Sequence, residues 1–548
     1  MDRQKRKKMR NLRVMFTNIF MALSVLALVA ILMLIAMGYS FNIKTGIQQS
    51  GLVEIVSRPG AATVEIDGTT KFERTKISTM LTSGKHELKI TKSGYDIWQR
   101  SLDVDPGLLT SIDWVRLFPV NPEVYEAKTY EDIRYVNFST NRKSMFLIEK
   151  GSLSAYYVDL QTEKLDTQKI KLATILNVAP EFVTEGTFKI TSWNKEANKI
   201  LLSWTRALPD EEGNIGEPST DLYLVDLKSP DKTINLTKNF NLHFSRALFA
   251  NDSGSKLWVL ESGNLRSIDL SNLTISGLIA SKVEILTNNK DVVAFVNTDE
   301  NGERAIRIYV DGETGASVVK ELADEQKDAK ISLSTGTYWS DNWIAYTVDK
   351  ELRVLSGSYP SYDKPSKNSM RELEKQELAF IPNLISVNED QSIIILASGK
   401  QVYALDIETT HHFNYEVDAD LTSINWLDEY LTWQYVDNKI VVRDFDGYNR
   451  RELISENDNQ FGVLLTENDD WLYFFDLKIV HPEPTNCTTG AGDSAITEGD
   501  VDTNQATNCI DSVDAAPIHN YVLRREKLKI YSTKNTSRKG RYFLALSG

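Results

Sequence analysis

Hydrophobic and polar residues separate sharply near the amino end of the chain. An uncharged, mostly apolar run from Val14 to Met37 follows the segment 1–13, which carries seven Lys or Arg residues and one Asp. About 20 such residues are enough for a helix to cross the ~30 Å hydrocarbon layer of a bilayer. The pattern predicts a transmembrane helix over 14–37, a basic cytoplasmic tail over 1–13 and an extracytoplasmic remainder.

A cleavable signal peptide is the alternative for this segment. Ala36 and Gly38 are small residues at the spacing that a signal peptidase requires. The apolar run is nevertheless longer than the core of a typical signal peptide, which has about 7–15 residues, and no Cys follows it closely to receive a lipid. We therefore expect a retained single-pass anchor in the cell membrane, whereas cleavage would release the same ectodomain.

Apolar and polar residues alternate with a period of two after a short polar segment at 38–50. The alternating runs include Val53–Val56, Ala62–Ile66 and His86–Ile90, and turns that contain Gly or Pro separate them. This pattern is typical of antiparallel strands joined by tight turns. We expect a linker over 38–50 and a small β domain over 51–119.

Four short motifs give this β domain a family resemblance. In chain order they are Ser57–Ala62, Val64–Gly68, Ser83–His86 and Lys92–Tyr95. They resemble the PEGA domain, a compact β-sandwich-like module of surface-layer and other envelope proteins. The Glu of the Pro-Glu-Gly-Ala motif is absent, since Pro59 is followed directly by Gly60. The resemblance implies architecture and adhesion, and it transfers no active-site residue.

From residue 125 onward a longer unit repeats, with a polar turn, an apolar strand, a second turn and a strand that ends near an Asp. Eight copies of the first turn and strand begin 37–56 residues apart. They begin at Asn141, Glu196, Asp252, Asn289, Asp341, Asp390, Asp428 and Asp469. Repeated four-stranded units of this length are typical of β-propeller blades, which bury their faces by radial stacking. We predict an all-β propeller of seven or eight blades over 125–548, and the region resembles TolB-like and WD-type propellers.

Three insertions interrupt the predicted blades, at 207–220, 357–380 and 481–518. The second contains Ser369–Glu372, a capping-box sequence that predicts a short helix through Phe380. The third holds both cysteines of the chain, Cys487 and Cys509. Their predicted position outside the membrane favours a local disulfide over a reactive thiol or a metal pair. Long loops on rigid scaffolds are common recognition sites.

Net charge limits the kinds of partner. The chain carries −14 in total, and residues 1–13 carry +6, so the remaining residues carry −20. An acidic exterior argues against nucleic acid and against electrostatic docking onto anionic lipid. We expect a solvated, acidic ectodomain with no nucleic-acid partner.

The common catalytic motifs are missing from the chain. The nucleophile elbow, the H-E-x-x-H motif, the phosphate-binding loop and the dinucleotide fingerprint do not occur. His411 and His412 are adjacent, and neighbouring side chains on a strand point to opposite faces. We therefore assign no catalytic residue, no cofactor and no cofactor-binding residue.

One segment carries a calcium-like pattern. Asp500, Asp502 and Asn504 supply side-chain oxygens at alternate positions. Counted from Asp500 as position 1, Asp511 is at position 12, so the four residues match the first and last ligand positions of a 12-residue calcium loop. Gln505, however, replaces the Gly that the sharp turn needs, and flanking helices are missing. We prefer an acidic insertion without a metal and keep these four residues as weak calcium candidates.

Aromatic residues recur at equivalent strand positions of the repeats. They are Trp204, Trp258, Trp343, Trp426, Trp433 and Trp471. Packing between blades is the expected role, in preference to a sugar-stacking platform, because buried aromatic side chains contribute large apolar surfaces.

These patterns predict a membrane-anchored extracytoplasmic protein of the cell envelope whose propeller loops bind a protein, a peptide or a glycan. The alternative is a propeller-type hydrolase or lyase, whose acidic residues converge from several blades without a local motif. Carboxylates with a basic or Tyr partner in the central channel would favour the enzyme. An apolar plug in that channel would favour the binding protein.

Overall fold

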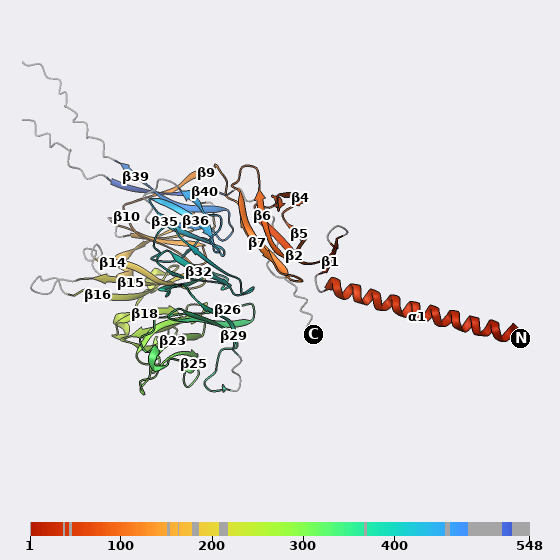
Figure 1. Ribbon diagram of the computed structural model, residues 1–548. Helices are drawn as coiled ribbons and strands as arrows, with labels where there is room; N and C mark the ends of the chain where they lie inside the picture. Colours follow the sequence, from red (N-terminus) through yellow and green to blue (C-terminus); the bar gives the residue numbers. More distant parts are fainter. Residues whose placement is uncertain are drawn as a thin grey trace, which may run out of the picture. The chain divides into compact units, whose positions relative to one another are not determined.

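The computed structural model describes residues 2–36, 39–42, 46–150, 154–162, 164–177, 186–207, 217–365, 370–454, 461–480 and 518–528. The chain divides into two compact units (Figure 1). The first comprises Met1–Glu123 with Lys527–Gly548, and the second comprises Val124–Glu526.

The first unit begins with the helix α1 (Asp2–Ala36), which continues from the basic segment into the apolar run without a break. Within it, Arg13–Leu34 has a mean hydropathy of 2.4, and none of its most apolar stretch is buried in the protein. Among the described residues this is the one helix long and apolar enough to cross a membrane. Signal sequences share these properties, so the helix by itself does not distinguish an anchor from a signal sequence.

Two four-stranded sheets follow α1 and form a β-sandwich. In the first sheet β2 pairs with β1, β5 and β8, and the second has the order β4-β3-β6-β7. The strands are β1 (Tyr39–Asn42), β2 (Gly46–Arg58), β3 (Thr63–Ile66), β4 (Thr69–Arg74), β5 (Ile77–Thr82), β6 (Gly84–Thr91), β7 (Trp98–Val104) and β8 (Leu109–Arg116). Ile55, Val64 and Trp98 have no exposed surface in the shared core. The period-two alternation therefore predicted the sandwich correctly.

The expected linker over 38–50 is wrong in its described part. Tyr39 pairs with Gln49, so β1 and the beginning of β2 form an antiparallel hairpin there. The segment is polar because a strand at the edge of a small sheet needs few apolar side chains. Its backbone groups are satisfied by the neighbouring strand, which sequence composition does not reveal.

The second unit contains eight four-stranded sheets among its described residues. The first four consist of β10 (Ile133–Phe138), β11 (Ser144–Glu149), β12 (Ser154–Asp159), β13 (Thr167–Lys171); β14 (Thr187–Trp193), β15 (Lys199–Arg206), β16 (Ser219–Asp226), β17 (Ile234–Asn235); β18 (Phe244–Phe249), β19 (Lys256–Glu261), β20 (Asn264–Asp269), β21 (Thr274–Ile275); and β22 (Val283–Asn289), β23 (Val292–Thr298), β24 (Arg304–Val310), β25 (Ser317–Glu321). The short helices α2 (Leu172–Leu176) and α3 (Leu236–Phe240) and the 3-10 turns Pro230–Lys232 and Asp324–Gln326 connect strands.

The remaining sheets consist of β26 (Ile331–Tyr338), β27 (Asp341–Val348), β28 (Glu351–Gly357), β29 (Arg371–Glu377); β30 (Leu384–Val387), β31 (Ile393–Ser398), β32 (Gln401–Asp406), β33 (His412–Glu416); β34 (Asn425–Trp426), β35 (Leu431–Val436), β36 (Lys439–Asp444), β37 (Arg451–Ile454); and β38 (Val463–Leu465), β39 (Trp471–Val480), β40 (Ile518–Lys527), β9 (Glu123–Glu131). In the last sheet β9, from the beginning of the unit, pairs with β40 near its end. The ring is thus closed by pairing strands that are distant in sequence.

The eight repeated apolar segments are the second strands of the eight sheets, so the propeller prediction is confirmed. Apolar side chains from neighbouring sheets meet in shared clusters, such as the one that joins Phe146 of β11 to Trp204 of β15. Trp204, Trp258 and Trp343 are at most 1% exposed, and this confirms their expected packing role. The indole N–H of Trp343 also donates to the carbonyl of Gln391, in the next sheet.

The predicted helix from Ser369 to Phe380 is wrong. Residues Arg371–Glu377 form β29, which pairs with β28 as the fourth strand of the fifth sheet. The sequence RELEKQE suits a helix by local propensity, but the exposed edge of β28 offers a full row of hydrogen-bond partners. Ser369, the residue on which the capping-box assignment depends, lies outside the described residues.

His86 on β6 lies between two hydrogen-bond acceptors. Its Nδ1 is 2.6 Å from Oδ2 of Asp67, in the turn after β3, and its Nε2 is 2.8 Å from the carbonyl oxygen of Thr82. Two acceptors favour the imidazolium, in which both nitrogens donate. Burial lowers the pKa of His86, but the bonds to Asp67 and Thr82 outweigh it and raise the pKa overall. The same contact with His86 lowers the pKa of Asp67.

We expect the stability of the sandwich to depend on pH through this pair. Because the pKa of His86 is raised above its unfolded value of about 6.5, its contribution is complete below that pH and is lost as the pH rises through the folded-state pKa. Protection factors from hydrogen exchange of β3 and β6 in the full chain should therefore fall as the pH rises above about 6.5. His86→Gln should abolish this fall, and an unchanged trend in that variant would contradict the assignment.

Gly336 on β26 occupies a position where a larger residue does not fit. A Cβ there would lie 2.4 Å from Cζ2 of Trp343, whose side chain is buried. We expect Gly336→Ala to lower the free energy of unfolding by about 1–3 kcal/mol through overpacking. At Gly277 no atom lies within 4 Å of such a Cβ, so Gly277→Ala is the matched control. Denaturant titration followed by Trp fluorescence measures both, and equal effects would refute the packing argument.

Candidate functional site

The turns between the first and second strands of the sheets share one backbone geometry in several repeats. In five of them, among the described residues, the carbonyl of a polar residue accepts the N–H of the third residue after it, at 2.9–3.2 Å. The accepting residues are Ser139, Asn194, Asn251, Asn388 and Thr466. The donating residues, which all have φ between +53° and +63°, are Arg142, Ala197, Gly254, Gln391 and Asp469.

The side chain of the first residue completes each of these turns. The Oδ1 of Asn194 accepts the N–H of Lys199 at 2.8 Å, and the Oδ1 of Asn388 accepts the N–H of Ile393 at 2.9 Å. Ser139, Asn251 and Thr466 make equivalent bonds. Polar residues recur before each apolar strand because they satisfy the backbone where the chain reverses.

These turns surround a cavity of about 1010 Å³. Residues from all eight sheets line it, mostly from the first strand or the turn that follows. Because strands alternate in direction within a sheet, the second-to-third connections lie at the other end. The described residues that flank two of the predicted insertions lie at that other end: Arg206 and Ser219 for 207–220, and Val480 and Ile518 for 481–518. The cavity therefore lies at the opposite end of the sheets from these flanking residues.

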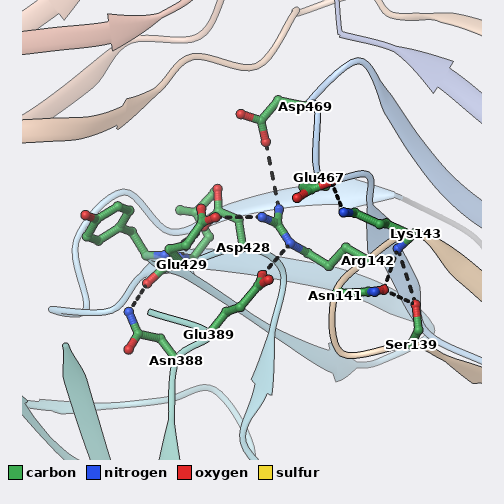
Figure 2. Close-up of polar contacts among 12 residues, drawn as sticks. Ser139, Asn141, Arg142, Lys143, Asn388, Glu389, Asp428, Glu429, Glu467 and Asp469 are labelled. Atoms are coloured by element: carbon green, nitrogen blue, oxygen red, sulfur yellow. Dashed lines mark hydrogen bonds and ion pairs between the residues drawn. The ribbon is translucent and has the colours of Figure 1, made fainter. Parts of the chain in front are cut away.

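Arg142 lies beside this cavity, and its side chain is only 7% exposed. Its Nη2 donates to Oε1 of Glu429 at 2.7 Å, and its Nε donates to Oε2 of Glu389 at 3.3 Å (Figure 2). Its Nη1 lies 3.8 Å from Oδ1 of Asp469. One guanidinium from the first sheet therefore contacts carboxylates from the sixth, seventh and eighth sheets.

Neighbouring polar contacts hold the same turns together. Lys143 forms an ion pair with Glu467 at 2.8 Å. The amide of Asn388 donates to the backbone carbonyl of Glu429 at 2.8 Å. Asn141 donates to the carbonyl of Lys195, in the second sheet, at 3.0 Å. The cluster therefore connects adjacent sheets and crosses the seam at which the ring closes (Figure 2).

The electrostatics of the cluster depend on burial and on charge pairing. Burial lowers the pKa of Arg142, but the surrounding carboxylates, with Glu429 first, outweigh this and raise it. Burial raises the pKa of Glu389, and Arg142 only partly opposes the shift. The side chain of Glu389 is 39% exposed, against 11% for Glu429 and 10% for Asp469. Among the carboxylates that contact Arg142, Glu389 is therefore the most accessible to a molecule in the cavity.

Aromatic side chains line much of the remaining wall. Trp193, Trp339 and Trp426 come from the second, fifth and seventh sheets. The indole of Trp193 donates to Asn137 at 2.6 Å, and that of Trp426 donates to Ser386 at 3.0 Å. Trp339 is 59% exposed and has a φ of +56°, a strained backbone conformation for so bulky a residue. An exposed, strained Trp beside a cavity is suited to contact a ligand.

The residues predicted as weak calcium candidates, Asp500, Asp502, Asn504 and Asp511, lie outside the described residues. The same holds for Cys487 and Cys509, so their disulfide stays a prediction. Within the described ranges, no group of three or more His, Cys, Asp or Glu side chains is arranged to hold a metal ion.

Sequence reasoning missed Arg142, Glu389 and Trp339. The available signal was the repeat itself. At the last position of the turn, Ala197 and Gly254 are small and uncharged, whereas Arg142 and Asp469 are oppositely charged. Aligning the turns would have exposed these charges. It would not have shown that they meet, because they are more than 300 residues apart.

Residues 50–116 match the PEGA domain family. This match covers the two sheets of the sandwich except β1 and the first residues of β2, and it confirms the resemblance of that part of the chain. No curated protein matches the chain.

Solved β-propeller structures resemble the chain at low sequence identity. The C-terminal WD40 domain of Sif2 is 13% identical, with a TM-score of 0.39, and the similarity covers 64% of this chain and 95% of that one. Porphyromonas gingivalis dipeptidyl peptidase 4 is 10% identical, with a TM-score of 0.42, covering 64% and 56%. A chain of the mitotic checkpoint complex is 12% identical, with a TM-score of 0.34, covering 53% and 88%. These similarities concern the fold alone.

We expect Arg142→Met to lower the free energy of unfolding by about 3–5 kcal/mol, because it leaves buried carboxylates without their cation. Lys195→Met is the matched control. Lys195 pairs with Asp252 at 3.0 Å, but the two side chains are 68% and 53% exposed, so its loss should cost only about 0–1 kcal/mol. Denaturant titration measures both variants, and a similar cost for the two would show that the cluster does not hold the ring together.

Proposed function

We propose that the chain is a membrane-anchored, extracytoplasmic binding protein of the cell envelope. Its propeller takes a protein segment, a peptide or a glycan into the cavity surrounded by the first-to-second turns. The observation that carries this proposal is the cavity of about 1010 Å³, lined by all eight sheets and bordered by the exposed side chain of Trp339.

The lining supports recognition of a partly polar ligand. Aromatic faces from Trp193, Trp339 and Trp426 offer apolar contact, whereas Lys195, Asp252 and the turn backbone offer polar groups. A mostly preformed concave site with aromatic walls and a few polar groups is typical of ligand-binding pockets. The ring holds these groups on strand ends, so a ligand would find them already in place.

Two features of the first unit support the proposed location. The span Arg13–Leu34 has the length and hydropathy of a membrane anchor, and seven basic residues at 1–13 favour a cytoplasmic amino end. The PEGA domain at 50–116 fits a module outside the membrane. The propeller would then be presented on the same side as the PEGA domain.

A propeller-type hydrolase or lyase is the second candidate, and one observation favours it. Carboxylates do meet a basic partner beside the channel, and burial raises the pKa of the accessible Glu389, which suits a general acid. Against this, Arg142, Glu429 and Asp469 are nearly buried and are bonded to one another. Of the three carboxylates that contact Arg142, only Glu389 therefore presents much reactive surface, and binding is the better-supported function.

The experiment is capture of ligands from libraries of short peptides and envelope glycan fragments by the full chain in detergent micelles. Trp339→Ala should weaken binding of the captured ligand by at least about tenfold, since exposed aromatic residues are common binding hot spots. Phe72→Ala is the matched control, because Phe72 is fully exposed on β4 in the other unit. Ligand recovered in cleaved form would favour the enzyme.

Failure to capture any member of either library would count against the proposal. Equal affinity of the Trp339→Ala variant and the unchanged chain for the ligand would show that the ligand does not bind in the cavity. Thermal unfolding of both variants controls for loss of fold, since neither side chain belongs to a core cluster of the described residues.

A further inference from the structure

The outer face of the first sandwich sheet carries a row of exposed apolar side chains. Leu52 on β2 is paired in register with Met80 on β5 and with Leu109 on β8. These three side chains are 39%, 53% and 52% exposed, respectively. They are adjacent across three hydrogen-bonded strands, so they form one continuous patch rather than scattered surface residues.

The turn between β7 and β8 extends this row. The turn lies close to β2, because the backbone N–H of Leu52 donates to the carbonyl of Leu108 at 3.0 Å. The side chain of Leu108 is 60% exposed. Gly51 makes the approach possible, because a Cβ there would lie 2.4 Å from the carbonyl oxygen of Asp105. We call Leu52, Met80, Leu108 and Leu109 the apolar row.

The next outward-facing position along the strands, two residues farther in sequence, is polar. Glu54 is paired in register with Ser78 and with Ser111. Glu54 also forms an ion pair with Lys76 at 2.6 Å. The strongly exposed apolar residues of these three strands are thus confined to one end of the face, and that end lies toward Gln49, where β2 pairs with β1.

Chain length keeps this end close to the end of α1. Two residues lie between Ala36 and Tyr39, so the two Cα atoms are three steps apart, which allows at most about 11 Å. Tyr39 is paired with Gln49, about 5 Å away as strand neighbours are, and Leu52 lies about 10 Å farther along the strand. The apolar row is therefore held within about 26 Å of the helix end, whatever the orientation of the sandwich.

We propose that the apolar row docks onto the outer surface of the membrane that α1 spans, with its side chains inserted among the lipid headgroups. The proposal rests on the proposed anchoring of the chain. The transfer of apolar side chains from water to the boundary between headgroups and acyl chains lowers the free energy. The acidic ectodomain gives no electrostatic attraction to anionic lipid, so the docking is apolar and works on zwitterionic lipid.

Docking gives the sandwich a function beyond that of a spacer. A domain that is connected to a helix by two residues, and that also contacts the bilayer, has a restricted orientation. The propeller would then be presented from a fixed base rather than from a freely turning tether. Loss of the apolar row should increase the mobility of the sandwich without affecting membrane insertion.

The test uses the full chain at one copy per nanodisc of phosphatidylcholine, with a photoactivatable diazirine on the acyl chain close to the headgroup. After illumination, lipid adducts are mapped by mass spectrometry. We expect adducts on peptides that contain the apolar row, at least about tenfold above those on the peptide that contains Phe72. Phe72 is the internal control, since it is fully exposed in the same sandwich but belongs to the other sheet.

A variant with Leu52→Ser, Met80→Ser and Leu109→Ser should lose most of these adducts while α1 keeps its own. All three side chains point away from the core, so the sandwich should keep its fold, which hydrogen exchange of β6 verifies. Equal labelling of Phe72 and the apolar row, or no labelling of the row, would overturn the docking proposal. If α1 also carries no adducts, the anchoring proposal fails with it, whereas a labelled α1 leaves anchoring intact.

Discussion

Burial of apolar sheet faces against one another is the constraint on which this structure depends. Each sheet of the second unit is apolar on both sides, as the fully buried second strands such as β11 show. Such a sheet is stable only between two neighbours, and sheets stacked in this way around an axis close into a ring. Trp204, Trp258 and Trp343 supply much of the packing surface. The cavity follows from this closure, because all first-to-second turns then converge at one end.

Convergence of the turns brings charges together that the chain keeps far apart. Arg142 has a positive φ, which normally favours Gly, and its guanidinium is nearly buried. Carboxylates from three other sheets compensate the cost of desolvating this cation. The cluster joins the first sheet to the last three, across the same seam that β9 closes by pairing with β40. Hydrogen-bonded strands and an ion-pair cluster thus stabilise one seam in two ways.

The first unit shows the same relation between packing and exposure on a smaller scale. The inner faces of its sheets form one core around Trp98. The outer face of β2 is divided between an apolar end at Leu52 and a polar end at Glu54. A core requirement does not explain this division, since both side chains point outward. The proposed docking of the apolar end onto the membrane surface near the end of α1 does explain this division.

Periodicity predicted most of the fold because alternation and repeat length depend on residues that are close in sequence. The eight apolar segments became the second strands of eight sheets, and the alternating runs of 51–119 became the sandwich. Prediction failed where a neighbouring strand decided the structure. Residues 371–377 have helical propensity but pair with the edge of β28, and residues 39–42, expected to be a linker, pair with β2.

The sequence by itself determined the apolar amino-terminal segment, the β architecture of both units and the number of apolar repeats. Each of these depends on a pattern among residues that are close together in the sequence, so it can be recognised without the tertiary structure. Only the tertiary structure decided which end of the ring holds the cavity, that Arg142 meets Glu389, Glu429 and Asp469, and that the exposed Trp339 lines this cavity. Ring closure brings these residues together from separate repeats, and no local pattern in the chain encodes which turns will face one another.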